Sequence, residues 1–159
     1  MSATLELQQL SDRAEITDLV ARLCVCLDES GFDDMAGLLA GEATVRTVRG
    51  EVVGRDAVVE QARRTHPADQ RFQHVITNLL VDLDGDRATA RANLEVHITV
   101  PGDGPAADGS PAPAPRASLG NVYRFGLARS EAGWRFARVE IEPVWVSGTL
   151  PPTVLPAAV

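Results

Sequence analysis

The sequence predicts an α+β fold in which a curved antiparallel sheet and covering helices enclose an apolar pocket. Three segments with helical periodicity lie before residue 65, and the chain after Arg71 is typical of sheet. This later part contains four long strand segments, which are paired by two tight turns into consecutive hairpins. Consecutive hairpins predict an antiparallel meander.

Length and composition indicate a single globular domain. The 159 residues are 45% hydrophobic and 23% charged, which is close to the average for folded domains. The net charge of −7 argues against nucleic acid or an anionic membrane as a partner, because both are bound through a basic surface. No segment has about 20 uninterrupted apolar residues, so we expect a cytoplasmic protein.

Three helices are expected in the first part of the chain. The apolar face of the first consists of Ile16, Leu19, Val20, Leu23 and Leu27. Ser11 or Asp12 would cap this helix, and Gly31 would end it in a left-handed conformation. A second, short helix is expected from Asp33 or Asp34, and a third over residues 55–64.

The strand segments are expected at residues 42–53, 71–83, 87–100, 117–128 and 134–146. The first is interrupted at Gly50 and has the pattern of a strand or a short hairpin. Residues 101–116 are rich in Pro, Gly and Ala and predict a flexible loop, and residues 149–159 predict an irregular tail. We therefore expect one domain over residues 1–159 with a core at about 11–148.

His74 is the most prominent polar residue in the strand expected at 71–83. Alternation places Phe72, His74, Ile76, Asn78 and Leu80 on one face. Both faces are largely apolar, which predicts a central strand covered on both sides. His74 and Asn78 then need polar partners, because an unpaired buried polar group costs roughly 1–3 kcal/mol. The pattern alone favours a structural histidine over a catalytic one.

Asp28 lies in the last turn of the first predicted helix, where the helix dipole disfavours a negative charge. Either solvent or a hydrogen-bonding partner such as an imidazole must therefore favour its carboxylate. A His–Asp pair would fix the imidazole tautomer and suit proton transfer near neutral pH. Periodicity does not show whether Asp28 and His74 meet.

The other candidates are weaker. Asn121 and Tyr123 share a strand face with Leu119 and Phe125 and would be polar groups in an apolar wall. His97 is expected to face solvent, opposite Leu94, and His66 is expected to have no special role. The histidine spacing does not fit a metal site, and no nucleophile or nucleotide motif is present.

The order of elements resembles the nuclear transport factor 2-like superfamily, and three segments resemble its SnoaL-like branch. These segments are AEITDLVARLCVCLDESGFDDMAGLLAGEATV, GRDAVVEQARR and RFQHVITNLLVDLDGDRATARANLEV, and GWRFARVEIEPVWVSG resembles the closing strand. The resemblance implies a cone-shaped fold in which three helices and a curved mixed or antiparallel sheet enclose an apolar pocket. It also implies a homodimer.

In relatives similar to scytalone dehydratase, an Asp at the end of the first helix and a His on the third long segment act as general acid–base groups. The resemblance places these roles on Asp28 and His74. Tyrosines often found near the helix-end Asp are replaced here by Leu27 and Cys24. The superfamily also includes non-catalytic binders, so the fold does not decide the function.

The predicted function is a cofactor-independent dehydratase, isomerase or cyclase that acts on a small hydrophobic, polycyclic or polyketide-like substrate. The predicted catalytic residues are His74 and Asp28, with no metal. The predicted substrate-binding residues are Asn78, Asn121, Tyr123, Phe72, Leu94, Phe125 and Trp145. The alternatives are a non-catalytic protein that binds a hydrophobic ligand and an epoxide hydrolase-like enzyme.

Overall fold

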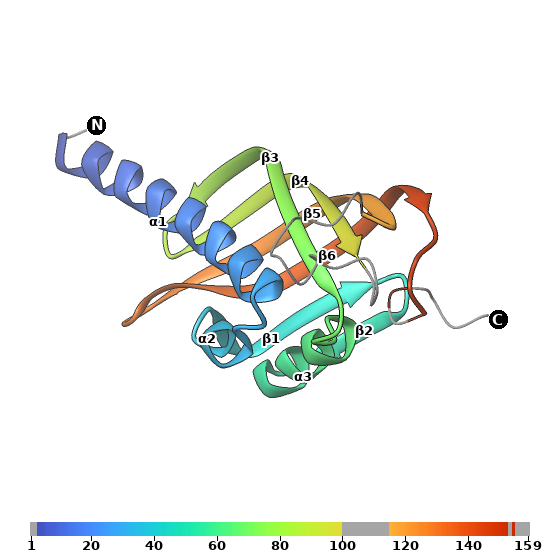
Figure 1. The fold of residues 1–159 in the computed structure, drawn as a ribbon. Coiled ribbons are helices and arrows are strands. Elements are labelled where there is room, and N and C mark those ends of the chain that lie inside the picture. The colour runs from blue at the N-terminus through green and yellow to red at the C-terminus, as the bar shows by residue number, and fades with distance from the viewer. Residues whose placement is uncertain (1–2, 100–114, 153, 155–159) are drawn as a thin grey trace, which may run out of the picture.

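A long amphipathic helix and two shorter helices pack against one six-stranded sheet (Figure 1). The structure, a computed structural model, describes residues 3–99, 115–152 and 154. In chain order the elements are α1 (Ala3–Asp28), α2 (Phe32–Ala36), β1 (Leu39–Thr47), β2 (Gly50–Val53), α3 (Arg55–Thr65), β3 (Arg71–Asp84), β4 (Arg87–Thr99), β5 (Ala117–Ser130) and β6 (Gly133–Gly148). The α+β class predicted from the sequence is confirmed.

The sheet has the strand order β2-β1-β6-β5-β4-β3. All neighbouring strands are antiparallel except β1 and β6, which are parallel, so the sheet is mixed. Register shifts occur between Thr77 and Leu80 and in two places along β5. Such bulges increase local twist and bend a sheet. The resulting sheet is curved and open, and its hollow side receives the helices (Figure 1).

The core lies between the helices and the hollow side of the sheet. Helix α1 contacts β3 and β6, whereas α3 contacts β1 and β2. The apolar face predicted for α1 is buried, from Ile16 to Leu27. The largest fully buried side chains are Trp134, Phe125, Phe136, Ile16, Leu94, Ile98, Val20 and Val58. They come from α1 and α3 and from β4, β5 and β6, so one core joins the two layers.

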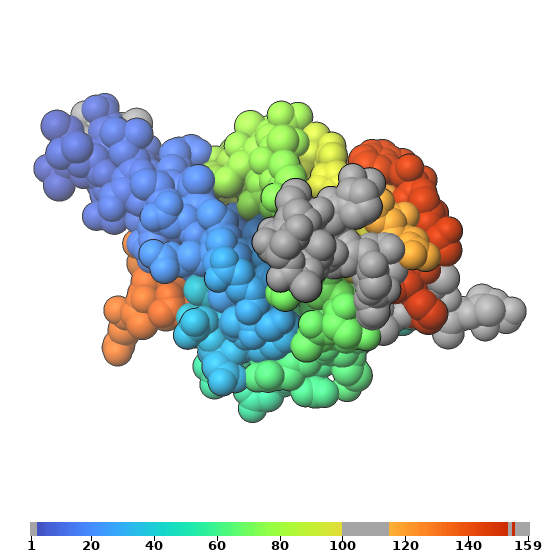
Figure 2. Space-filling view, in the orientation of Figure 1, coloured from blue at the N-terminus to red at the C-terminus, as the bar shows by residue number. Residues whose placement is uncertain are grey.

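Helix α1 begins earlier than predicted and ends differently. It starts at Ala3 instead of at a cap formed by Ser11 or Asp12. Its first turns project beyond the sheet (Figure 2), where Leu7 and Leu10 are exposed. At the other end, Ser30 and not Gly31 has the left-handed conformation, with φ of 59°. The Gly31 N–H then donates to the Cys26 carbonyl at 2.8 Å, which closes the helix end.

Strand β3 is an edge strand and not the predicted central strand. Its side chains Gln73, Val75 and Thr77 are exposed, so only one of its faces is covered. The prediction of a central strand was wrong because it inferred burial on both faces from the apolar residues on each. Those on the outer face of β3 are in fact exposed to solvent. The edge position leaves some backbone N–H groups of β3 without a strand partner, and one of these groups belongs to the functional site described below.

Most of the predicted loop at 101–116 lies outside the described residues. In the described part of the tail, residues 149–152 and 154 contain no helix or strand. The domain bounds of 1–159 stay a prediction. None of the helices among the described residues combines the length and apolar character that a membrane crossing requires.

Asp12 anchors α1 to the β5–β6 hairpin. Its buried carboxylate accepts hydrogen bonds from the Arg129 guanidinium at 2.6 Å and from the Trp134 indole N–H at 3.3 Å. The guanidinium of Arg129 also lies over the Trp134 ring, 4.5 Å from its centroid. The hydrogen bond from Arg129 lowers the pKa of the Asp12 carboxyl below its usual value. The charged form of Asp12 therefore stabilises the fold.

We expect Asp12→Asn to lower the free energy of unfolding by about 1–2 kcal/mol at pH 7. Because the folded pKa of Asp12 is lowered, its contribution is complete above the unfolded pKa of about 3.9. The contribution is lost as pH falls through the lower folded pKa. Urea unfolding of both proteins from pH 7 to pH 2.5, in steps of about half a unit, should therefore show converging stabilities.

The control for Asp12 is Asp18→Asn, which changes an exposed acid on the same helix. It should change the stability by less than about 0.5 kcal/mol at pH 7. If Asp12→Asn were as stable as the unmodified protein at neutral pH, the anchoring role of Asp12 would be wrong.

Candidate functional site

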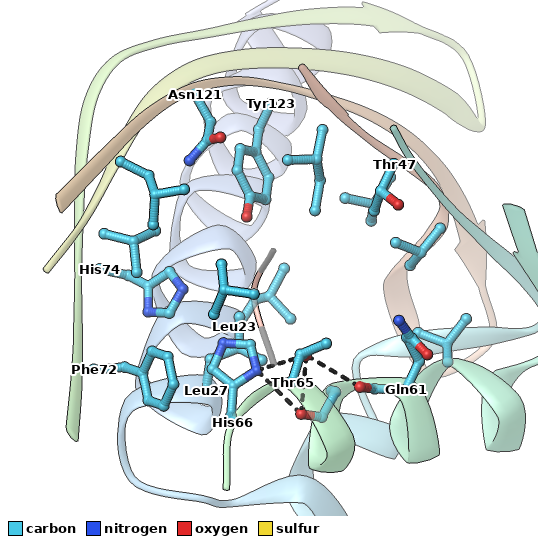
Figure 3. Close-up of a pocket in the computed structure, with 18 of the residues that line it drawn as sticks. Leu23, Leu27, Thr47, Gln61, Thr65, His66, Phe72, His74, Asn121 and Tyr123 are labelled. Carbon is cyan, nitrogen blue, oxygen red and sulfur yellow. Dashed lines mark hydrogen bonds between the residues drawn. The ribbon is translucent and has the colours of Figure 1, made fainter. Parts of the chain in front are cut away.

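A cavity of about 220 Å³ lies between α1, α3 and the hollow side of the sheet (Figure 3). Most of its lining side chains are apolar and come from the three helices and from β1, β3, β4, β5 and β6. The polar lining residues are Thr47, Arg49, Gln61, Thr65, His66, His74, Asn121 and Tyr123. Such a cavity fits a ligand that is largely apolar and is oriented by a few polar groups.

Asp28 and His74 meet at the wall of this cavity. The Nδ1 atom of His74 lies 2.5 Å from the Asp28 Oδ1. The backbone N–H of His74 also donates to both carboxylate oxygens, at 3.1 Å each. The carboxylate therefore accepts from a backbone N–H that has no strand partner, because β3 is at the edge of the sheet. Three hydrogen bonds offset the unfavourable position of a negative charge at the C-terminus of α1.

These contacts determine the proton position on His74. A carboxylate only accepts, so Nδ1 carries the proton in the neutral imidazole and Nε2 has a free lone pair. The His74 side chain is 3% exposed and lines the cavity, whereas Asp28 lies behind it and is not in the lining. Nε2 is therefore available to a ligand in the cavity. This arrangement can remove a proton from a bound molecule and stabilise the resulting imidazolium.

Asn121 and Tyr123 reach into the cavity from β5 (Figure 3). Their inward orientation agrees with the alternation expected for this strand, and both residues are buried. Within the described part of the chain, neither side chain has a hydrogen-bond partner. Burial raises the pKa of the Tyr123 hydroxyl, and the nearby Cys24 raises it further. Tyr123 is therefore a neutral phenol that can donate to a ligand oxygen.

His66 also lies in the cavity, and the sequence reasoning missed it. It follows the end of α3, and its ring lies 5.6 Å from that of His74 and 4.5 Å from that of Phe72, between ring centroids. Its position before Pro67 was a usable signal, because a proline restricts the preceding residue and ends the helix there. The side chain can then fold back over the last helical turn toward the sheet.

Asn78 does not line the cavity, which corrects its prediction as a substrate-binding residue. It is exposed and has a left-handed backbone, with φ of 54°. It lies within the register shift between Thr77 and Leu80, where one residue is inserted into the alternation. After this bulge Leu79 and Val81 face inward in place of Asn78 and Leu80.

Three other predicted substrate-binding residues also lie outside the cavity lining. Leu94 and Phe125 are buried in the core on the inward faces of their strands. Trp145 lies on the outer face of the sheet, opposite Gly120, because an extra residue in β6 shifts the register there. Phe72, in contrast, lines the cavity as predicted from its alternation with His74.

Cys24 and His97 are the remaining candidates for acid–base or nucleophilic chemistry, and both have limited roles. Burial and the charge of Asp28 raise the pKa of Cys24 to about 12, so this thiol stays protonated and is a poor nucleophile. His97 is on the outer face, where its Nδ1 lies 2.8 Å from the Ser118 hydroxyl. Among the described residues, no group of three His, Cys, Asp or Glu side chains could hold a metal ion.

The SnoaL-like domain model matches residues 8–140, which is most of the chain, so the chain belongs to the SnoaL-like family. No curated protein sequence matches the chain.

Solved structures of similar fold come from several proteins. Rv3472, a protein of unknown function from Mycobacterium tuberculosis, is 23% identical with a TM-score of 0.71, and the match covers 91% of this chain and 77% of that chain. A hexachlorocyclohexane dehydrochlorinase, LinA type 2, is 16% identical with a TM-score of 0.74, and coverage is 92% and 98%. A candidate scytalone dehydratase from Novosphingobium aromaticivorans is 15% identical with a TM-score of 0.75, and coverage is 98% and 97%. At these identities the likeness shows the fold alone.

The outer position of Trp145 can be tested through Gly120. A Cβ added at Gly120 would overlap the Trp145 indole, so the indole must move away. We expect Gly120→Ala to shift Trp fluorescence to longer wavelength, since a displaced indole becomes more hydrated. Gly126→Ala is the control, because its Cβ would lie 3.4 Å from the Arg138 Cβ, close to an ordinary contact. Equal emission maxima in the two variants would contradict the described packing.

Proposed function

We propose that the chain is a cofactor-independent enzyme that performs acid–base chemistry on a small, largely apolar metabolite. The observation that carries the proposal is the hydrogen bond between Asp28 and His74 Nδ1, which directs Nε2 to the cavity. Membership of the SnoaL-like family is consistent with this function. Two of the similar folds belong to a dehydrochlorinase and a candidate dehydratase, and both names denote elimination reactions.

In the proposed reaction His74 Nε2 removes a proton from a carbon beside a carbonyl or another activating group. Asp28 stabilises the imidazolium that forms, and the apolar walls exclude water from the charged intermediate. The Tyr123 hydroxyl and the Asn121 amide stabilise negative charge on the substrate oxygen by hydrogen bonds. The imidazolium then returns its proton to a leaving group, to another carbon, or, when the enolate carbon has attacked a second carbonyl and closed a ring, to the alkoxide oxygen that this attack forms. Dehydration, isomerisation and cyclisation of a polycyclic or polyketide-like substrate all fit this sequence.

In the last three turns of α1, before Asp28, no side chain carries a hydroxyl group that could hold a water molecule near the Asp28 carboxylate. Leu27 and Cys24, at the places where relatives often have tyrosine, are both buried in the core. Tyr123 is the single tyrosine of the sequence. A reaction that needs only Tyr123 and Asn121 as donors is therefore favoured. The predicted homodimer and cytoplasmic location stay predictions.

An epoxide hydrolase-like mechanism is not supported by the lining. It would need carboxylates and an arginine around an activated water. Arg49 lines the cavity, but no Asp or Glu does so among the described residues. A non-catalytic binding protein is the second candidate, and the predominantly apolar walls favour it because they would retain a hydrophobic ligand without chemistry.

We expect His74→Ala to lower proton-transfer activity about 100-fold or more and Asp28→Asn about 10-fold or more. The first change removes the base, and the second removes the charge that stabilises the imidazolium. Activity can be measured without the natural substrate as exchange of α-protons for deuterium in a panel of bicyclic ketones, by NMR. Loss of water from hydroxylated members of the panel can be followed by mass spectrometry.

Matched control variants distinguish a loss of activity caused by changes in the site from a loss caused by a general effect of substitution on the protein. His97→Ala changes a histidine on the outer face, and Asp33→Asn changes an exposed acid paired with Arg63. Both should keep the unmodified rate within a factor of about two. If the site variants exchanged α-protons as fast as the controls, the acid–base proposal would fail. Retention of a ligand by the purified protein, with no turnover of any ketone, would favour the binding function.

A further inference from the structure

His66 places a second imidazole in the cavity, and its hydrogen bonds differ in kind from those of His74. The His66 Nδ1 lies 3.0 Å from the Ala62 carbonyl oxygen. A carbonyl only accepts, so Nδ1 carries the proton and donates it to this oxygen. The Thr65 hydroxyl donates to the Gln61 carbonyl at 3.1 Å, and its oxygen lies 3.0 Å from Nδ1, where it can accept from the same ring N–H. The Ala62 carbonyl belongs to the last turn of α3 and also accepts from the backbone N–H of His66 at 3.0 Å, so its oxygen holds this residue through both the backbone and the ring.

The second nitrogen of His66, Nε2, is therefore unprotonated and can accept a hydrogen bond. It has no partner among the described residues, and His66 lines the cavity beside His74 and Phe72. Figure 3 shows the ring at the α3 side of the cavity, with its other nitrogen joined to the helix end by hydrogen bonds. The packing against Phe72 and the contacts to the helix end hold the ring in this orientation.

His66 stays neutral across the physiological range. Burial and, to a smaller extent, the nearby His74 lower the pKa of His66 to about 4. His74 differs, because a carboxylate oxygen of Asp28 lies 2.5 Å from its Nδ1. The two rings therefore have different capacities. His74 can hold a proton during a reaction, whereas His66 can only accept a hydrogen bond.

We propose that His66 is a ligand-positioning residue whose Nε2 accepts a hydrogen bond from a hydroxyl or N–H group of the ligand. The ligand then carries such a donor at its α3 end and an oxygen acceptor at the end that faces Asn121 and Tyr123. An apolar ring system between the two groups fills the cavity. This inference specifies the ligand class of the site in the proposed function, but its test measures binding and not turnover.

The matched probes are 6-acetyl-2-naphthol, its methyl ether and 2-acetylnaphthalene. All three have the same ring system and ketone, but only the naphthol has a hydrogen-bond donor. We expect the unmodified protein to bind the naphthol about fivefold more tightly than either of the other two, as one net hydrogen bond would give. 2-Acetylnaphthalene controls for the bulk of the ether methyl group. Dissociation constants can be measured by fluorescence titration at pH 7.

In His66→Phe, which keeps a ring for packing, we expect this preference to fall to about one. His66→Gln retains an acceptor oxygen and should keep part of the preference, so it also serves if His66→Phe does not fold. The outer-face variant His97→Phe should keep the fivefold preference.

Two results would overturn the proposal. One is a preference that persists in His66→Phe or disappears in His97→Phe. The other is the absence of any preference in the unmodified protein, including failure to bind all three probes at 1 mM. Neither result depends on catalysis, so the acid–base function can fail while the role of His66 stands. Conversely, the role of His66 can fail while the acid–base function stands.

Discussion

The contact between Asp28 and His74 is the constraint on which the site depends. One carboxylate at the end of α1 accepts two kinds of N–H from the same residue of β3, one from the backbone and one from the imidazole. The backbone contact satisfies an exposed strand edge and fixes where α1 ends relative to β3. The imidazole contact fixes the tautomer. The same interaction therefore positions the helix and leaves a basic nitrogen at the cavity wall.

The cavity presents two kinds of polar group to a ligand. The two imidazoles present unprotonated nitrogens from β3 and from the end of α3, whereas β5 presents an amide and a phenol that can donate. Each imidazole is oriented by the acceptor behind it, a carboxylate for His74 and a backbone carbonyl for His66. Because charge stabilises a protonated ring far better than a neutral dipole does, only His74 is suited to carry a proton. The apolar walls strengthen this distinction by excluding water.

Bulges decide which side chains reach the cavity. A regular strand alternates its side chains strictly, and one inserted residue exchanges the faces of everything beyond it. The insertion at Asn78 turns this residue to solvent, and the one opposite Gly120 turns Trp145 to the outer face. Before the bulge in β3, Phe72 and His74 keep their predicted inward orientation. The bulges therefore explain why Asn78 on β3 and Trp145 on β6 lie outside the cavity. Leu94 and Phe125 lie outside it for another reason, because they face inward but are buried beneath the residues that line it.

The sequence by itself determined the elements that depend on local pattern. Periodicity identified the buried face of α1, helix α3 and the four long strands within a few residues, and it selected Asp28, His74, Asn121 and Tyr123 as polar residues in apolar surroundings. Only the tertiary structure decided the parallel pairing of β1 with β6, the edge position of β3, the meeting of Asp28 with His74 and the presence of His66 in the cavity. These features join segments far apart in the chain. Their geometry depends on sheet curvature and helix packing, which short-range periodicity does not encode.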